Sequence, residues 1–355
     1  MALLSLRNVS KSFAQEKVVN NINLEIAEGE FIALLGPSGC GKSTILRMIA
    51  GFEELSEGSI YHGGACFSSP KNTLPPEERN FGMVFQSYAL WPHMNVSENV
   101  GYPLHVKGIR GAKKRQRIEQ ALEVVQLQPF ANRFPADLSG GQRQRVALAR
   151  SLVTEPEVVL LDEPLANLDR HLRATMEETF RLFHRSTGAT MVYVTHDQAE
   201  AMSLADKIAV LRKGELVQWG TPTQLYQQPQ NTWLANFVGR GAVIKINGAM
   251  AGEICDKQVI TRHFLESEFD NRLDSIGESI LVRPQAVTIN VETGIPATVT
   301  QCVFRGEHYD IELRLVDGQT LFAYHSQIIP IGTLTFVSID NGWGLEQEGE
   351  TCQDI

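Results

Sequence analysis

The stretch GPSGCGKST at residues 36–44 decides the fold of the first part of this 355-residue chain. It matches the pattern Gly-x-x-x-x-Gly-Lys-Ser/Thr, whose glycines let successive backbone N–H groups curl around phosphates. The apolar run Phe31–Leu35 before it predicts a buried strand, and the apolar spacing over residues 45–49 after it predicts a helix. A strand, a phosphate loop and a helix in that order predict a nucleotide site.

Two side chains of this loop are expected to have separate tasks. Lys42 should reach the β- and γ-phosphates, and the hydroxyl of Ser43 should bind Mg²⁺. The residues expected to hold the nucleotide are those of the whole loop: Gly36, Pro37, Ser38, Gly39, Cys40, Gly41, Lys42, Ser43 and Thr44.

Two carboxylates follow a second apolar run. Val158–Leu161 predicts another buried strand, which would carry Asp162 to the carboxyl end of a sheet, where ligands bind in open α/β folds. Asp162 can hold Mg²⁺ there through water. Glu163, one residue later, is expected to be the base that polarises an attacking water. The alternative is a pair of ordinary carboxylates at a strand end, which the phosphate loop in the same chain disfavours.

A third apolar run leads to a histidine. Met191–Val194 predicts a buried strand that would bring His196 to the same edge of the sheet. There it could contact the γ-phosphate or the attacking water. A single histidine after a strand is more often structural, so its position by itself leaves both roles open.

The segment Ser139-Gly140-Gly141-Gln142 predicts the start of a helix over residues 142–152. Ser139 is well placed to cap this helix, with free N–H groups above it. A helix N-terminus of this kind can take an anion. The residues alone fit a capped surface helix equally well.

The hydrophobic pattern divides the chain into two domains. Short apolar runs alternate with helix-patterned stretches in the first part, which predicts an α/β domain with a doubly wound parallel sheet over residues 1–238. Within it, residues 88–152 are interpreted as an inserted helical subdomain. Residues 239–355 are β-rich. The alternation over residues 308–315 predicts a strand with one buried and one wet face, followed by a hairpin turn at Asp317-Gly318.

Charge and composition exclude several classes of protein. The chain has 32 Lys+Arg against 41 Asp+Glu, and residues 241–355 carry 7 and 17 of these. This acidic balance is unsuited to holding nucleic acid, so no nucleic-acid partner is expected. The five cysteines are scattered, which argues against a disulfide framework or a zinc site. We find no signal-peptide core, and no run approaches the ~18–20 apolar residues that span a bilayer.

Taken together, these motifs resemble the nucleotide-binding subunit of an ATP-binding cassette (ABC) transporter. The subfamily that they resemble most imports maltose and other sugars, polyamines, ferric iron and phosphonates. The resemblance is dense over residues 3–240, and residues 281–284 resemble a phrase of that subfamily's accessory domain. It implies ATP and Mg²⁺ as cofactors, ATP hydrolysis as the activity, and an OB-like, regulatory or dimer-stabilising fold for the C-terminal domain.

The resemblance also implies roles for residues that physical reasoning left open. Gln86 would sense Mg²⁺ and the water, Asp169 would lie at a dimer seam, and His196 would hold the γ-phosphate. Phe13 stands where the family usually places an aromatic that stacks on adenine, although Tyr or Trp is more usual there. A place in the core is the alternative for Phe13.

The family pattern implies partners as well. Two copies would form a homodimer, with each ATP between the phosphate loop of one copy and the Ser139–Gln142 helix start of the other. The dimer would serve integral membrane permease subunits at the cytoplasmic face of the bacterial inner membrane, fed by a periplasmic or lipid-anchored solute-binding protein. The apolar segment 87–94 would lie beside the groove for the permease, with local packing as the alternative. The solute stays open among ferric iron, a polyamine, a sugar and a phosphonate, with a lean to ferric iron.

Two other functions fit parts of the sequence. A soluble cassette ATPase of DNA repair or translation shares the motifs, but such proteins usually carry two cassettes or a long coiled coil, and this chain has one phosphate loop and no long heptad tract. A P-loop kinase would leave the Ser139–Gln142 segment without a task.

Overall fold

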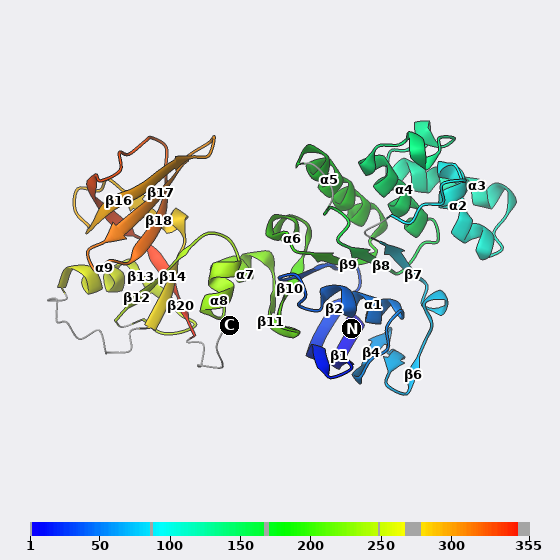
Figure 1. Ribbon diagram of the computed structural model, residues 1–355, viewed down its shortest axis with the longest axis horizontal. Helices are drawn as coiled ribbons and strands as arrows, with labels where there is room; N and C mark the ends of the chain where they lie inside the picture. The colour runs from blue at the N-terminus through cyan, green and yellow to red at the C-terminus, as the bar shows by residue number, and fades with distance from the viewer. Residues whose placement is uncertain (1, 86–87, 167–169, 248, 267–277, 347–355) are drawn as a thin grey trace. The chain divides into compact units, whose positions relative to one another are not determined.

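The computed structural model describes residues 2–85, 88–166, 170–247, 249–266 and 278–346. The chain divides into two compact units, Met1–Pro222 and Thr223–Ile355 (Figure 1). Two short helices, α7 (Pro222–Gln227) and α8 (Thr232–Phe237), lie at or beyond this division. The domain boundary predicted at residue 238 lies after both helices, where the sequence pattern changes to short β-rich segments.

A six-stranded sheet forms the centre of the first unit. Its strands are β3 (Phe31–Leu35), β7 (Phe81–Val84), β8 (Val158–Asp162), β9 (Thr190–Thr195), β10 (Lys207–Arg212) and β11 (Glu215–Gly220). They run in the order β11-β10-β3-β9-β8-β7, and every neighbouring pair except β10–β11 is parallel. All residues of β3, β8 and β9 are buried, so the predicted parallel sheet is confirmed.

Three helices follow strands of this sheet. They are α1 (Lys42–Ala50) after β3, α5 (Arg170–Thr187) after β8 and α6 (Gln198–Leu204) after β9. Because the strands are parallel, the three strand ends that precede these helices lie at one edge of the sheet. This edge therefore collects the phosphate loop, Asp162 and His196.

A second, antiparallel sheet in the first unit was not predicted. Its strands are β1 (Ala2–Phe13), β2 (Glu16–Ala27), β4 (Glu57–His62), β5 (Ala65–Ser69) and β6 (Asn72–Thr73), in the order β2-β1-β4-β5-β6. Leu4, Leu6 and Ile22 from this sheet share an apolar core with Ile45 and Leu46 of α1. The sheet thus covers the helix that begins at Lys42.

The predicted helical subdomain is confirmed over the described part of residues 88–152. It comprises α2 (Val96–Val106), α3 (Gly111–Val124) and α4 (Gly140–Leu152), with short 3-10 turns at Gln128–Phe130 and Pro135–Asp137. Figure 1 shows these helices grouped beyond the β7 edge of the parallel sheet. A further 3-10 turn, Pro76–Glu78, precedes β7. No helix among the described residues is long and apolar enough to cross a membrane.

The second unit is built mainly from two sheets. One has the order β12-β14-β20-β13, and the other β15-β19-β16-β17-β18. The strands are β12 (Ala242–Ile246), β13 (Ile254–Asp256), β14 (Glu278–Val282), β15 (Val287–Ile289), β16 (Ile295–Phe304), β17 (Tyr309–Leu315), β18 (Thr320–His325), β19 (Leu334–Ile339) and β20 (Asn341–Leu345). One apolar core joins both sheets and α9 (Lys257–Glu266). The predicted all-β, OB-like architecture is therefore confirmed.

The strand predicted over residues 308–315 is β17, and its hairpin with β18 turns at Asp317-Gly318 as expected. One side-chain prediction on this strand was wrong. The alternation over residues 308–315 puts Asp310 on the wet face, opposite Tyr309 and Ile311, yet Asp310 is only 8% exposed and accepts hydrogen bonds from Arg240 and Arg305. Burial opposes the charge on Asp310, but the hydrogen bond from Arg305 and the charge of Arg240 outweigh it and lower its pKa.

Candidate functional site

The predicted phosphate loop joins β3 to α1 at the carboxyl end of the parallel sheet. Gly39 and Gly41 have φ values of +81° and +98°, which side-chain-bearing residues rarely adopt. Lys42 is 5% exposed, and its Nζ donates hydrogen bonds to the carbonyl oxygens of Gly36 at 2.8 Å and Pro37 at 2.9 Å. The loop therefore holds a buried positive charge at a helix start, an arrangement that suits phosphate.

Close packing behind the loop explains two further glycine requirements. A Cβ atom at Gly36 would lie 2.3 Å from the carbonyl oxygen of Leu211, and one at Gly41 would lie 2.8 Å from that of Val18. Either atom would push the loop off the strands β10 and β2 that support it. The loop is thus a backbone cradle, and its shape and charge fit the phosphates of a nucleotide.

Ser43 and Asp162 meet directly, although they are 119 residues apart in the chain. The Ser43 hydroxyl donates a hydrogen bond of 2.8 Å to Oδ1 of Asp162, at the end of β8. Asp162 is 8% exposed, so its carboxylate is buried beside the buried Lys42 loop. A hydroxyl and a carboxylate oxygen are oxygen ligands of the kind that Mg²⁺ prefers, and the pair fits the metal expected here.

Glu163 and His196 also meet at this edge. His196 Nδ1 lies 3.5 Å from Oε2 of Glu163, and the two side chains are 54% and 24% exposed respectively. Glu163 has a φ of +44°, a left-handed backbone that is unusual for a glutamate, and its N–H donates to Val194 O at 3.1 Å. A strained backbone held by the neighbouring strand aims this carboxylate, a feature found at functional sites.

The predicted helix start at Ser139 is confirmed, although the helix begins two residues earlier than expected. Ser139 is the N-cap of α4 (Gly140–Leu152), and its hydroxyl accepts from the N–H of Gln142 at 3.3 Å. Gln142 Oε1 in turn accepts from the N–H of Ser139 at 2.9 Å. This capping box leaves the N–H groups of Gly140 and Gly141 without an intrahelical partner. The helix start is therefore able to take an anion.

Gln144 is a residue that sequence reasoning missed. It lies one turn inside α4, is fully buried, and donates through Nε2 to the carbonyl oxygen of Pro164 at 2.5 Å. Pro164 follows Glu163, so this bond ties α4 to the loop carrying the predicted base. A polar residue within the buried face of a helix was the signal that could have identified Gln144.

Gln86 and Asp169 lie outside the described residues, so their predicted roles stay predictions. Phe13 ends β1 and is 46% exposed, with Lys11 Nζ 4.8 Å from its ring centroid. A place in the core, the alternative considered for Phe13, is therefore wrong. An exposed ring is free to stack on a base.

The apolar segment after residue 87 packs partly on its own helical subdomain. Tyr88, Leu90, Trp91 and Met94 are each half-buried, and the Trp91 ring centroid lies 4.4 Å from that of Tyr102. More exposed aromatics stand nearby in the sequence. Phe85 is 37% exposed and contacts Phe52, which is 54% exposed, with 6.0 Å between the ring centroids. Local packing thus explains part of the apolar character of this segment, and exposed aromatic surface remains beside it.

Cys40 lies within the phosphate loop, and its burial predicts how fast its thiol reacts with an alkylating agent. It is 3% exposed, and burial raises the pKa of its thiol against the opposing charge of Lys42. Because the thiolate is the reactive form, we expect alkylation of Cys40 at pH 7.5 to be about tenfold or more slower than that of the exposed Cys66. The rate should keep rising with pH toward the raised pKa. Modification should block ATP hydrolysis, and bound MgATP should protect.

Mass spectrometry of the two cysteine peptides against time, with ATPase assays on the same samples, measures both effects. Cys66→Ser is the control, because it removes the fast-reacting thiol and leaves the loop untouched. Full activity after complete modification of Cys40 would contradict the prediction.

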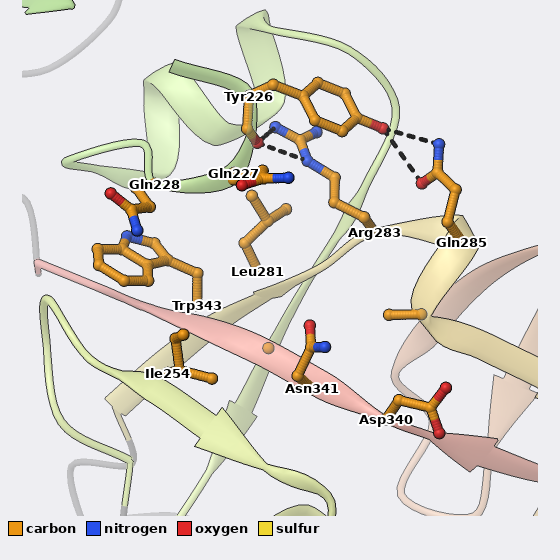
Figure 2. A pocket seen from close by; sticks show the side chains of 12 residues that line it. Tyr226, Gln227, Gln228, Ile254, Leu281, Arg283, Gln285, Asp340, Asn341 and Trp343 are labelled. Carbon is orange, nitrogen blue, oxygen red and sulfur yellow. Dashed lines mark hydrogen bonds between the residues drawn. The ribbon is translucent and has the colours of Figure 1, made fainter. Parts of the chain in front are cut away.

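A pocket of about 580 Å³ lies in the second unit, between α7 and the strands β14 and β20 (Figure 2). Three of its polar residues bond to one another. Arg283 donates through Nε and Nη2 to Tyr226 O at 3.0 and 2.6 Å and stacks on the Tyr226 ring, and the Tyr226 hydroxyl pairs with Gln285. These contacts hold α7 on the β-domain.

Comparison with known proteins connects this geometry to a family. Residues 19–166 match the model of the ABC transporter family, and residues 280–341 match that of the TOBE domain. The chain is 49% identical over 253 residues to the sn-glycerol-3-phosphate import ATP-binding protein UgpC 1 of Rhizobium johnstonii, covering 71% of this chain and 68% of that protein. It is 43% identical over 317 residues to the maltose/maltodextrin import ATP-binding protein MalK of Yersinia pestis, covering 88% and 83%.

A solved structure agrees with these relatives. The dimeric, post-hydrolysis structure of the ATP-binding cassette MJ0796 bound to ADP and Pi superposes with a TM-score of 0.54 at 35% identity, covering 62% of this chain and 98% of that one. The matched motifs, the loop geometry and the β-domain point the same way. The chain belongs to the ATP-binding cassette (ABC) transporter family, as an ATPase with a C-terminal TOBE domain.

Proposed function

We propose that this chain is the ATP-hydrolysing subunit of a bacterial importer, and that it works as a homodimer beneath separate permease subunits at the cytoplasmic face of the inner membrane. The observation that carries the proposal is the likeness to an import ATP-binding protein over 88% of this chain, through the ATPase part and into the β-domain. We place the ATPase domain at residues 1–238 and a regulatory β-domain at residues 239–355.

Hydrolysis in this proposal transfers the γ-phosphoryl group of ATP to water. The bond between the bridging oxygen and the γ-phosphorus breaks, and ADP and phosphate form. Glu163 takes a proton from the attacking water. His196, whose Nδ1 lies 3.5 Å from Oε2 of Glu163, donates a hydrogen bond to a γ-phosphate oxygen. Lys42 binds the β- and γ-phosphates. Ser43 and Asp162 would hold Mg²⁺, which neutralises charge on the phosphates when bound.

The start of α4 would bind ATP only when two copies of the chain form a dimer. Its N–H groups at Gly140 and Gly141 and the hydroxyl of Ser139 would bind the γ-phosphate of the ATP held by the partner copy's loop. Asp169 would lie at the seam between the copies, and Gln86 would sense Mg²⁺ and the water. ATP binding would then close the dimer and hydrolysis would reopen it, so that the permease receives a mechanical signal.

We propose that the solute is a sugar or a glycerol phosphate. The two import proteins compared above are named for sn-glycerol-3-phosphate and for maltose and maltodextrin. They support a sugar or a glycerol phosphate over ferric iron, the solute favoured by the sequence alone. The permease and an external solute-binding protein would make the selection, because the residues proposed for the ATPase site would bind only the nucleotide, Mg²⁺ and the attacking water.

The experiment is purification of the full chain, with an affinity tag, from detergent-solubilised membranes of its own organism. We expect permease subunits to copurify, and their reconstitution with the chain in vesicles to couple ATP hydrolysis to uptake of a sugar or a glycerol phosphate. Association with ribosomes or DNA in place of permease subunits would support the soluble alternative. Transfer of labelled γ-phosphate to a small molecule would support the kinase alternative.

A further inference from the structure

The strand β9 carries His196 to a position between two other parts of the candidate site. In the parallel sheet, β9 lies between β3 and β8. Thr195, its last residue, pairs with Leu35, which leads into the phosphate loop, and Val194 pairs with Asp162 of β8. His196 follows directly, so the backbone at the end of β9 decides where the His196 ring lies relative to the phosphate loop.

A buried acid on α6 binds the residue that precedes His196. Glu200 is 3% exposed, and its Oε2 accepts hydrogen bonds from the hydroxyl groups of Thr195 at 2.7 Å and Tyr193 at 2.8 Å. Thr195 is itself only 2% exposed. Because a buried polar group without a partner is costly, these bonds hold the carboxyl group and the end of β9 together.

The residue that follows His196 is held by the same group of side chains. Asp197 is the N-cap of α6, and its N–H donates to the Thr195 hydroxyl at 2.9 Å. From α5, Arg173 Nη1 donates to Oδ2 of Asp197 at 2.8 Å, and its Nε lies 3.6 Å from Oε1 of Glu200. The Thr195 hydroxyl accepts from one neighbour of His196 and donates to Glu200, so one chain of hydrogen bonds spans both sides of His196.

The His196 side chain itself is 54% exposed, although its Nδ1 lies 3.5 Å from Oε2 of Glu163. Its place beside the predicted base therefore depends on the backbone that carries it. We propose that Glu200 is a positioning residue for ATP hydrolysis, which acts by fixing the backbone on both sides of His196. The proposal rests on the role given above to His196. Glu200 is buried beneath the site and acts on the γ-phosphate only through that histidine.

The test measures kcat and the ADP dissociation constant of the full chain separately. Glu200→Ala removes the carboxyl group, and we expect kcat to fall by ~10- to 100-fold, as for a small displacement of a reacting group. The ADP dissociation constant should change by less than about threefold, because ADP lacks the γ-phosphate that His196 would meet. Glu200→Gln keeps an oxygen that accepts from Thr195, so its kcat should exceed that of Glu200→Ala at least about threefold.

A double-mutant cycle distinguishes positioning from general stability. If Glu200 acts through His196, adding Glu200→Ala to His196→Ala should lower kcat by less than about twofold further. Release of radiolabelled phosphate measures these low rates. Ser203→Ala is the matched control, since it removes an exposed hydrogen bond of 3.0 Å between α6 and Glu177 of α5. It should leave kcat within about twofold of its value in either background.

Each result of these measurements bears on the proposal. Wild-type kcat in Glu200→Ala overturns it, and so does an equal loss with and without His196. If Glu200→Ala does not fold, Thr195→Val removes the hydroxyl that joins the acid to the backbone after His196, and an unchanged kcat there overturns the proposal. Wild-type kcat in His196→Ala refutes the role of the histidine, whereas a loss there with a full further loss from Glu200→Ala refutes only the positioning role.

Discussion

Replacing Lys42 with alanine is expected to abolish nucleotide binding by the full chain. The ammonium group is 5% exposed and bonded to two loop carbonyls, so its removal takes away both a phosphate ligand and a contact that shapes the loop. We expect the ATP dissociation constant to rise at least ~100-fold, which corresponds to about 2.7 kcal/mol. Titration with a fluorescent ATP analogue, or calorimetry, measures the change.

Two further variants make the Lys42 experiment specific. Lys42→Arg keeps the charge, but the wider guanidinium does not match the buried slot, so binding should remain weak. Lys113→Ala removes an exposed lysine of α3 and should bind ATP as the wild type does. Tight ATP binding by Lys42→Ala would show that the loop 36–44 is not the phosphate site.

Replacing Glu163 with glutamine is expected to separate binding from chemistry. The amide keeps the shape of the side chain but cannot take a proton from water, so hydrolysis should slow by at least ~10²-fold. The ATP dissociation constant should stay close to that of the wild type, because Glu163 does not belong to the phosphate loop at residues 36–44. The closed dimer should accumulate, since hydrolysis is the step that reopens it.

Steady-state ATPase assays and size-exclusion chromatography with and without MgATP report both effects of this substitution. Glu119→Gln serves as the control, because Glu119 is an exposed carboxylate of α3. Wild-type turnover by Glu163→Gln would remove Glu163 from the role of base. Slow turnover without a dimer would leave the base assigned and contradict the proposed closure.

The parts of the site that follow single strands could be predicted from the sequence. The loop at 36–44, Asp162 and His196 each come directly after a short apolar run, and parallel strands must bring such ends to one edge. The contact of Ser43 with Asp162 is a consequence of this rule. Local pattern and sheet geometry together were sufficient here.

Other parts depend on packing between distant segments, which a local pattern does not record. The bond from Arg150 to Tyr88 spans 62 residues, and that from Gln144 to Pro164 spans 20. The burial of Asp310 has the same origin, because Arg240 reaches it from 70 residues away and a strand's alternation cannot foresee such a partner. The antiparallel sheet was missed because its long strands carry no motif and mix polar with apolar residues.

The left-handed backbone of Glu163 bears on how this protein can change through mutation. A glutamate at φ +44° costs the folded chain about 1–2 kcal/mol relative to a relaxed backbone, and glycine at this position would not incur that cost. A mutation to glycine would therefore relieve strain and remove the base at once. Selection for heat resistance alone would favour inactive descendants at this position, so only continued demand for ATP turnover keeps the glutamate in place.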